Sequence, residues 1–101
     1  MIHPTIERLN ELFDYERGGS GALIWRVGRK GRAVGSIAGY ETPRKELRVN
    51  IDGVSYLAAK VAWALDMGYW PDKRLKFLNG DRTDIRIANL EETDRKDGPG
   101  R

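Results

Sequence analysis

The chain has 101 residues, enough for one domain, and carries 18 Lys and Arg against 15 Asp and Glu, no cysteine and one histidine, His3. Without cysteine, disulfides, thiolate nucleophiles, iron–sulfur clusters and cysteine-type zinc sites are excluded. A single histidine also argues against a histidine-rich metal site or a Ser-His-Asp triad, so any activity has to come from carboxylates, amides, Lys or Arg, or from binding alone.

The charge is distributed unevenly along the chain. Residues 1–16 hold one base and four acids, residues 17–60 nine bases and three acids, and residues 61–101 eight of each. The middle segment, with a net charge of +6, therefore carries the positive field. Clustered bases are typical of phosphate binding, and a solvated sheet surface is the equally good alternative.

No run of about 18 apolar residues is present, which argues against a membrane span. The N-terminal segment is amphipathic and acidic, unlike a signal peptide. We therefore expect a cytoplasmic protein with no membrane partner.

The first half of the chain predicts a helix followed by strands. Apolar residues at helical spacing predict an amphipathic helix over residues 4–15, which ends in the glycine-rich turn 17–21. A short strand over 22–27, a hairpin loop over 28–32 and a weak second strand over 34–40 follow. Residues 46–51 alternate cleanly, with Leu47, Val49 and Ile51 on one face, and Asp52-Gly53 is the strongest turn signal, leading into a strand over 54–56.

In the second half of the chain, the spacing of the apolar residues changes from every second residue, as in a strand, to the 3.6-residue period of a helix. A helix is predicted over residues 57–67, with Gly68 as its left-handed cap. A short strand over 75–78 leads into the turn 79–81, residues 84–90 predict one or two helical turns, and residues 97–101 read as a disordered end. The expected organisation is an N-terminal helix (1–16), one domain (17–93) and a disordered tail (94–101).

Several short motifs carry a resemblance to a known family. They are Leu12-Phe13-Asp14-Tyr15, Leu23-Ile24-Trp25, Ile51-Asp52-Gly53, Tyr56-Leu57-Ala58, Ala62-Trp63, Gly68-Tyr69-Trp70-Pro71, Asn79-Gly80-Asp81-Arg82-Thr83-Asp84 and Ile87-Ala88-Asn89-Leu90. Over residues 12–93 the chain resembles the small HNH endonucleases of phages and mobile elements, which often carry an AP2-like DNA-binding sheet. The resemblance implies an α+β fold: a small antiparallel sheet packed on a helix, then a ββα-metal (HNH-like) motif.

The resemblance also implies a catalytic site from which this chain departs. The family places an Asp-His pair, the metal ligand and the general base, where Lys76 and Phe77 stand here, and a further histidine where Ala59 stands. Ile85 replaces a usual Asn, and the position of a closing Asn falls near Gly98, in a Gly-Pro segment that does not sustain a helix. Phenylalanine accepts no proton and lysine repels a dication. We therefore expect a degenerate, inert HNH fold with no metal and no cofactor.

Other parts of the family pattern remain, and they favour a structural role. Gly80 permits a positive φ, and Asp81 and Asn89 are able to hold the loop through hydrogen bonds to the backbone.

DNA contacts are predicted for basic and amide side chains of the sheet. A sheet that presents Arg and Asn at period two is able to enter a major groove, where Arg reads guanine and Asn adenine. The alternative is that these side chains only face water. The three tryptophans are expected in the core. The alternative applies to Trp25 alone, which, if exposed on the sheet, would be able to pack on a sugar or base. The predicted contacts are Arg26, Arg29, Lys30, Arg32, Arg44, Lys45, Arg48, Asn50 and Lys76.

Lys76 has a second interpretation. Its ammonium group would take the place of the family's metal ion and meet a DNA phosphate by charge alone. A solvated lysine on a short edge strand is the competing interpretation.

Three functions follow from these features. The first is a non-catalytic, HNH-like DNA-binding protein of phage or mobile-element origin, acting in a bacterial host cell. The second is a phage inhibitor of anti-CRISPR or anti-restriction type, which would bind a host protein complex through helix 4–15 or Tyr69-Trp70-Pro71. The third, a residual metal-dependent nuclease, ranks below both. The oligomeric state stays open.

Overall fold

The computed structural model describes residues 3–16, 19–28 and 32–96. Its helices and strands form an α+β arrangement, as the sequence predicts. Their bounds are α1 Ile6–Leu12, β1 Phe13–Tyr15, β2 Leu23–Trp25, β3 Tyr40–Glu41, β4 Leu47–Ile51, β5 Val54–Leu57, α2 Ala58–Met67, β6 Lys73–Phe77, the 3-10 turn η1 Ile87–Asn89 and β7 Leu90–Lys96.

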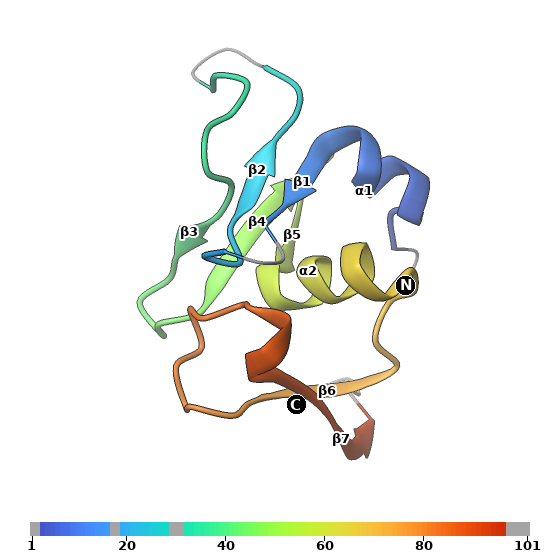
Figure 1. The fold of residues 1–101 in the computed structure, drawn as a ribbon, viewed down its shortest axis with the longest axis vertical. Coiled ribbons are helices and arrows are strands. Elements are labelled where there is room, and N and C mark those ends of the chain that lie inside the picture. The colour runs from blue at the N-terminus through green and yellow to red at the C-terminus, as the bar shows by residue number, and fades with distance from the viewer. Residues whose placement is uncertain (1–2, 17–18, 29–31, 97–101) are drawn as a thin grey trace.

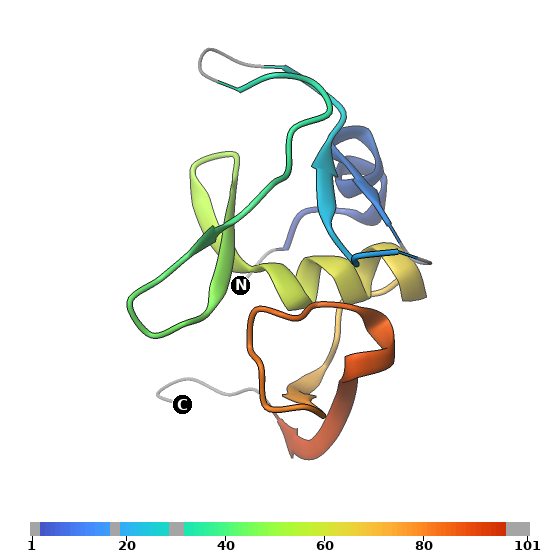
Figure 2. The ribbon, with the colours of Figure 1, turned by 60° about the vertical axis from the view of Figure 1, so that its left-hand side comes forward.

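Helix α2 lies at the centre of the molecule (Figures 1 and 2). Above it lie α1 and the first two sheets, and below it lies the β6–β7 hairpin. Seven of its ten residues are buried, because four alanines allow neighbouring elements to approach closely. The helix ends at Gly68, whose φ of 84° and N–H bond to the Ala64 carbonyl form the predicted left-handed cap.

The strands of the described residues form three separate antiparallel sheets rather than one. Two of them, β1–β2 and β6–β7, have two strands, and the third has the order β3-β4-β5. The predicted turn at Asp52-Gly53 joins β4 to β5, and both residues have positive φ, 50° and 83°. This geometry matches the right-handed twist of a hairpin, so the prediction is confirmed.

Two predictions in the first half are wrong in extent. Helix α1 ends at Leu12 rather than residue 15, because Phe13 and Tyr15 pair with Trp25 and Leu23 and bury their rings. The predicted strand 34–40 is reduced to β3 and an isolated bridge from Ile37 to Ile24. Of the expected hairpin loop 28–32, residues 29–31 lie outside the described residues.

The C-terminal hairpin also differs from the prediction. The segment 84–90 contains only η1, a single 3-10 turn, before β7 begins. Strand β7 continues to Lys96, opposite Lys73, so the ordered backbone extends three residues into the expected tail. The rest of that tail, including the position near Gly98, lies outside the described residues.

One core joins these elements apart from β3, whose two residues are exposed. Leu9 and Leu12 of α1 belong to the same buried cluster as α2 and the strands. The N-terminal helix is therefore part of the domain rather than an appendage. Within the described ranges, neither α1 nor α2 combines the length and the apolar character that crossing a bilayer requires.

Replacing Leu9 by Ala tests the contribution of α1. Leu9 is fully buried, so the cavity left behind should lower the free energy of unfolding by about 2 to 5 kcal/mol, measured by urea denaturation. The exposed Glu7→Ala variant of the same helix is the control and should change it by less than about 1 kcal/mol. Equal effects of the two variants would contradict the packing of α1 in the core.

Candidate nucleic-acid interface

A polar sheet face covers the outer side of β3–β4–β5. It consists of Tyr40, Arg48, Asn50 and Ser55, which the register brings together: Arg48 lies opposite Tyr40, and Asn50 opposite Ser55. Val49 is buried on the other side. The predicted alternation of β4 is thus confirmed, and Arg48 and Asn50 share one face.

Hydrogen bonds order the polar sheet face. Arg48 Nε donates to Ser55 Oγ over 2.7 Å, and the Tyr40 hydroxyl lies 3.2 Å from the same oxygen and donates to Asn50 Oδ1 over 3.4 Å. Arg48 Nη1 also lies 3.8 Å from Glu46. A ligand on this face would therefore meet side chains whose rotamers are already restricted, which lowers the entropy lost on binding.

The first predicted hairpin provides fewer candidate DNA contacts than the sequence suggests. Arg26 donates to the Asn10 carbonyl over 2.9 Å and lies 3.9 Å from Asp14, so it holds the end of α1. Arg29 and Lys30, also predicted contacts, are outside the described residues. Arg26 thus has a structural role whatever else it binds.

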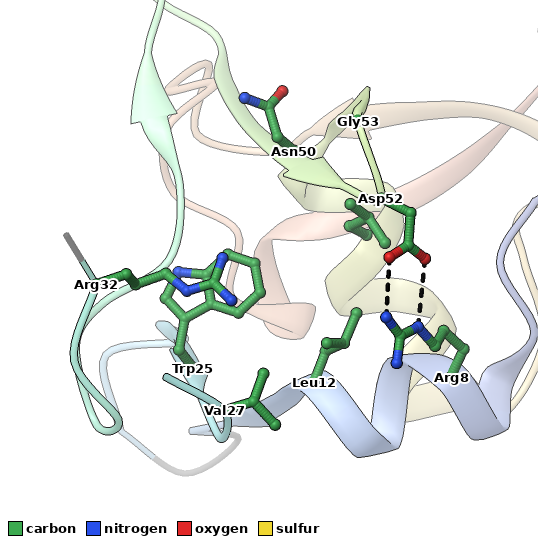
Figure 3. Close-up of a pocket in the computed structure, with 9 residues that line it drawn as sticks. Arg8, Leu12, Trp25, Val27, Arg32, Asn50, Asp52 and Gly53 are labelled. Carbon is green, nitrogen blue, oxygen red and sulfur yellow. Dashed lines mark hydrogen bonds and ion pairs between the residues drawn. The ribbon is translucent and has the colours of Figure 1, made fainter. Parts of the chain in front are cut away.

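The side chain of Trp25 is not exposed on the sheet, so the alternative in which it contacts DNA is wrong. It is buried against Phe13, with the ring centroids 4.4 Å apart. The Arg32 guanidinium covers its other side, 3.4 Å from the ring centroid (Figure 3). This cation–π contact closes the ring to a sugar or base.

An open pocket of about 420 Å³ lies beside this stack, between α1, the end of β2 and the β4–β5 turn (Figure 3). Across it from Trp25, Arg8 binds both carboxylate oxygens of Asp52, at 3.2 and 2.8 Å. This pair raises the pKa of Arg8. Its two charges neutralise each other, so the pair ties α1 to the β4–β5 turn.

A second pocket, of about 400 Å³, brings together the two positions to which the HNH resemblance assigns histidines. Ala59, at the start of α2, and Phe77, at the end of β6, both line it. We call it the α2–β6 pocket, and its lining residues are Arg44, Glu46, Leu57, Ala59, Lys60, Arg74, Leu75, Phe77 and Arg82.

Four cations and one carboxylate line the α2–β6 pocket. Arg82 donates to the Arg44 carbonyl and lies 3.9 Å from Glu46, which joins the loop after β6 to the β3–β4 turn. Burial, followed by the nearby charges of Arg48 and Arg74, lowers the pKa of Lys60. The pocket is therefore strongly electropositive.

This lining does not fit the divalent metal that the family implies. A hard dication needs several oxygen or imidazole ligands. Among the described residues of the lining, the only carboxylate is that of Glu46, which lies between Arg48 and Arg82. Over the described part of the chain, no group of three or more His, Cys, Asp or Glu is arranged to hold a metal ion.

Lys76 does not belong to the α2–β6 pocket. It is exposed on β6, between Leu75 and Phe77, and lies opposite Glu91 in the register. The two pocket residues flank it because side chains alternate along a strand. Its predicted role as a substitute for the metal stays a prediction.

The loop 78–86 confirms the structural reading of the retained motif. Asn89 Oδ1 accepts from the Asn79 N–H, and Asn89 Nδ2 donates to the Asp84 carbonyl, both over 2.9 Å. Asp81 accepts from the backbone and hydroxyl of Thr83, and Gly80 has a φ of 79°. Asn89 is buried and fixes both ends of the loop.

Ile85, at the position to which the HNH resemblance assigns an Asn, is buried. Its carbonyl accepts a hydrogen bond of 2.6 Å from the Tyr15 hydroxyl on β1. This contact attaches the loop to the first sheet, so residue 85 has a packing role here.

Sequence reasoning missed three cations of the pocket: Lys60, Arg74 and Arg82. Arg74 lies where the β6–β7 register shifts, between Lys73 and Leu75, and such an irregularity has no clear sequence signal. Lys60 directly follows Ala59, to which the resemblance assigns a histidine, and this adjacency was the available signal. Of the predicted contacts, Arg44 lines this pocket, and Lys45 lies beside it in a hollow with Asp81.

A comparison with known families gives a match in the second half of the chain. Residues 56–97 match the HNH endonuclease family model, which covers the segment from the end of β5 through α2 and the β6–β7 hairpin. The match supports an HNH-like family and a function related to nucleic acids. No curated protein and no solved structure matches the chain.

Replacing Asn89 by Ala should loosen the loop. The change removes both side-chain hydrogen bonds and leaves a backbone N–H and a carbonyl without these partners. We expect a loss of about 1 to 3 kcal/mol in the free energy of unfolding, measured by chemical denaturation. Asn10→Ala, on the exposed face of α1, is the control and should cost less.

Asp84 should make stability depend on acid pH. Hydrogen bonds from Arg86 lower the pKa of Asp84 from 3.8 to about 2. Because the folded state favours the carboxylate, this stabilisation is present above pH 3.8 and is lost as the pH falls through about 2. Thermal unfolding should show a shallower decline over this range for Asp84→Asn than for the unmodified chain. An identical decline in both would contradict the assignment.

Proposed function

We propose that this protein is a non-catalytic, HNH-like protein that binds DNA through the polar sheet face. The observation that carries the proposal is the hydrogen-bonded set of Tyr40, Arg48, Asn50 and Ser55 on the outer side of β3–β4–β5. The HNH family match supports the choice of nucleic acid as the ligand.

The chemistry of this face suits base recognition. Arg48 and Asn50 stand two residues apart on β4, and these are the side chains that pair with guanine and adenine edges in a major groove. Segment 17–60, which contains the sheet, has nine bases against three acids. Its positive field would attract the phosphate backbone before bases are read.

The α2–β6 pocket supports the absence of catalysis. Hydrolysis of a phosphodiester by this fold needs a base to activate water and a metal to stabilise the phosphate. Phe77 and Ala59 stand where the family's histidines are expected, and neither side chain takes up a proton. The surrounding cations favour binding of a phosphate, and neither of the two positions assigned to histidines carries a group that activates water.

The internal contacts of Trp70 favour DNA binding over the inhibitor hypothesis. Trp70 Nε1 donates to the Pro4 carbonyl over 2.7 Å, and its ring stacks on His3 with centroids 4.7 Å apart. The central residue of the expected Tyr69-Trp70-Pro71 interface therefore holds the N-terminal segment.

The proposal is tested by fluorescence anisotropy with a labelled mixed-sequence DNA duplex. Affinity should fall steeply with salt, and Arg48→Gln should weaken binding about tenfold, since one specific base contact contributes about 1 to 3 kcal/mol. Lys73→Gln makes the same charge change on β6, away from the polar sheet face, and should have a much smaller effect.

The same titration separates the competing functions. Affinity should be equal in magnesium and in chelator, with no cleavage of the duplex. Cleavage that chelator abolishes would contradict a non-catalytic role. Equal losses in Arg48→Gln and Lys73→Gln would contradict the polar sheet face as the DNA contact, and no binding at physiological salt would contradict the proposal as a whole.

A further inference from the structure

We propose that the α2–β6 pocket binds the terminal phosphate of a nucleic-acid strand, so that the protein prefers DNA with a 5′-phosphate to the same DNA with a 5′-hydroxyl. This inference rests on the proposed function and adds a second contact to it, separate from the polar sheet face.

The charge of the pocket matches such a group. Arg44 comes from the β3–β4 turn, Lys60 from α2, Arg74 from β6 and Arg82 from the loop after β6. Four cations and the single carboxylate of Glu46 give a net charge of +3. A terminal phosphate carries a charge of about −1.5 to −2 and three acceptor oxygens, whereas each phosphate within a strand carries about −1.

Two of these guanidinium groups are not engaged by the described residues. Within the described ranges, the side chains of Arg44 and Arg74 make no hydrogen bond or ion pair. The carboxylate of Glu46 is shared by Arg48 and Arg82, at 3.8 and 3.9 Å. Its charge is therefore already compensated, and an anion entering the pocket would meet cations.

Lys60 supports the same assignment. Burial and the charges of Arg48 and Arg74 lower its pKa, so the surroundings of its ammonium group disfavour the charged form. A phosphate beside it would favour the charged form and raise the pKa. Leu57, which also lines the pocket, directly precedes α2, whose first turn has no side-chain cap.

The shape of the pocket favours a strand end. One wall is apolar, formed by Leu57, Ala59, Leu75 and Phe77. The volume of about 400 Å³ lies in the lower part of the range of about 300 to 1,000 Å³ typical of small-ligand pockets. A terminal nucleotide is able to place its phosphate among the cations and its sugar on the apolar wall. A continuous duplex backbone needs an open surface instead.

The test compares two otherwise identical oligonucleotide duplexes, one 5′-phosphorylated and one ending in a 5′-hydroxyl, by anisotropy with the full chain. We expect about tenfold tighter binding of the phosphorylated duplex, the effect of one charge-assisted hydrogen bond. Arg74→Gln and Lys60→Gln should bring the ratio of the two affinities close to one. Lys76→Gln makes the same charge change on the same strand outside the pocket and should leave the ratio unchanged.

Folding and ligand source are checked separately. Thermal unfolding of each variant shows that the exposed Arg74→Gln change leaves the fold intact. NMR titration with inorganic phosphate should shift signals of Lys60 and Arg74 more than those of Lys76.

The possible results distinguish failure of the terminal-phosphate site from failure of the proposed function. Binding of both duplexes with equal affinity, or a ratio that Arg74→Gln leaves unchanged, would overturn the terminal-phosphate site while the proposed function stands. Binding of inorganic phosphate without any binding of DNA would overturn both the strand-end assignment and the proposed function.

Discussion

The burial of helix α2 is the constraint on which the rest of the structure depends. Its four alanines and its apolar residues leave only three of ten positions outside the core. A helix that is apolar around most of its circumference has to be covered on several sides. Helix α1, the β4–β5 hairpin and the β6–β7 hairpin provide that cover, and none of these short elements has a core of its own.

This packing determines where the polar residues meet. The first turn of α2 carries Ala59 and Lys60 to the end of β6, and Arg82 connects the loop after β6 to the β3–β4 turn. Three segments distant in sequence thus enclose one pocket. Asn89 and Ile85 hold the loop after β6 by contacts that need no metal.

The two proposed contacts with DNA have different physical characters. The polar sheet face offers ordered hydrogen-bonding groups, so its contribution would appear mainly as specificity. The α2–β6 pocket offers charge, so its contribution would appear as affinity and as salt dependence. Arg48 links the two, because it bonds to Ser55 on the sheet and lies beside Glu46 at the edge of the pocket.

The sequence by itself determined the periodicity of α2 and β4, the Asp52-Gly53 turn, the Gly68 cap and the loop contacts of Asn89, because propensity, alternation and turn chemistry act over a few residues. Only the tertiary structure decided that α1 ends at Leu12, where strand pairing buries Phe13. The same holds for the pocket cations Lys60, Arg74 and Arg82. Their meeting depends on packing between segments far apart in the chain, which local patterns do not encode.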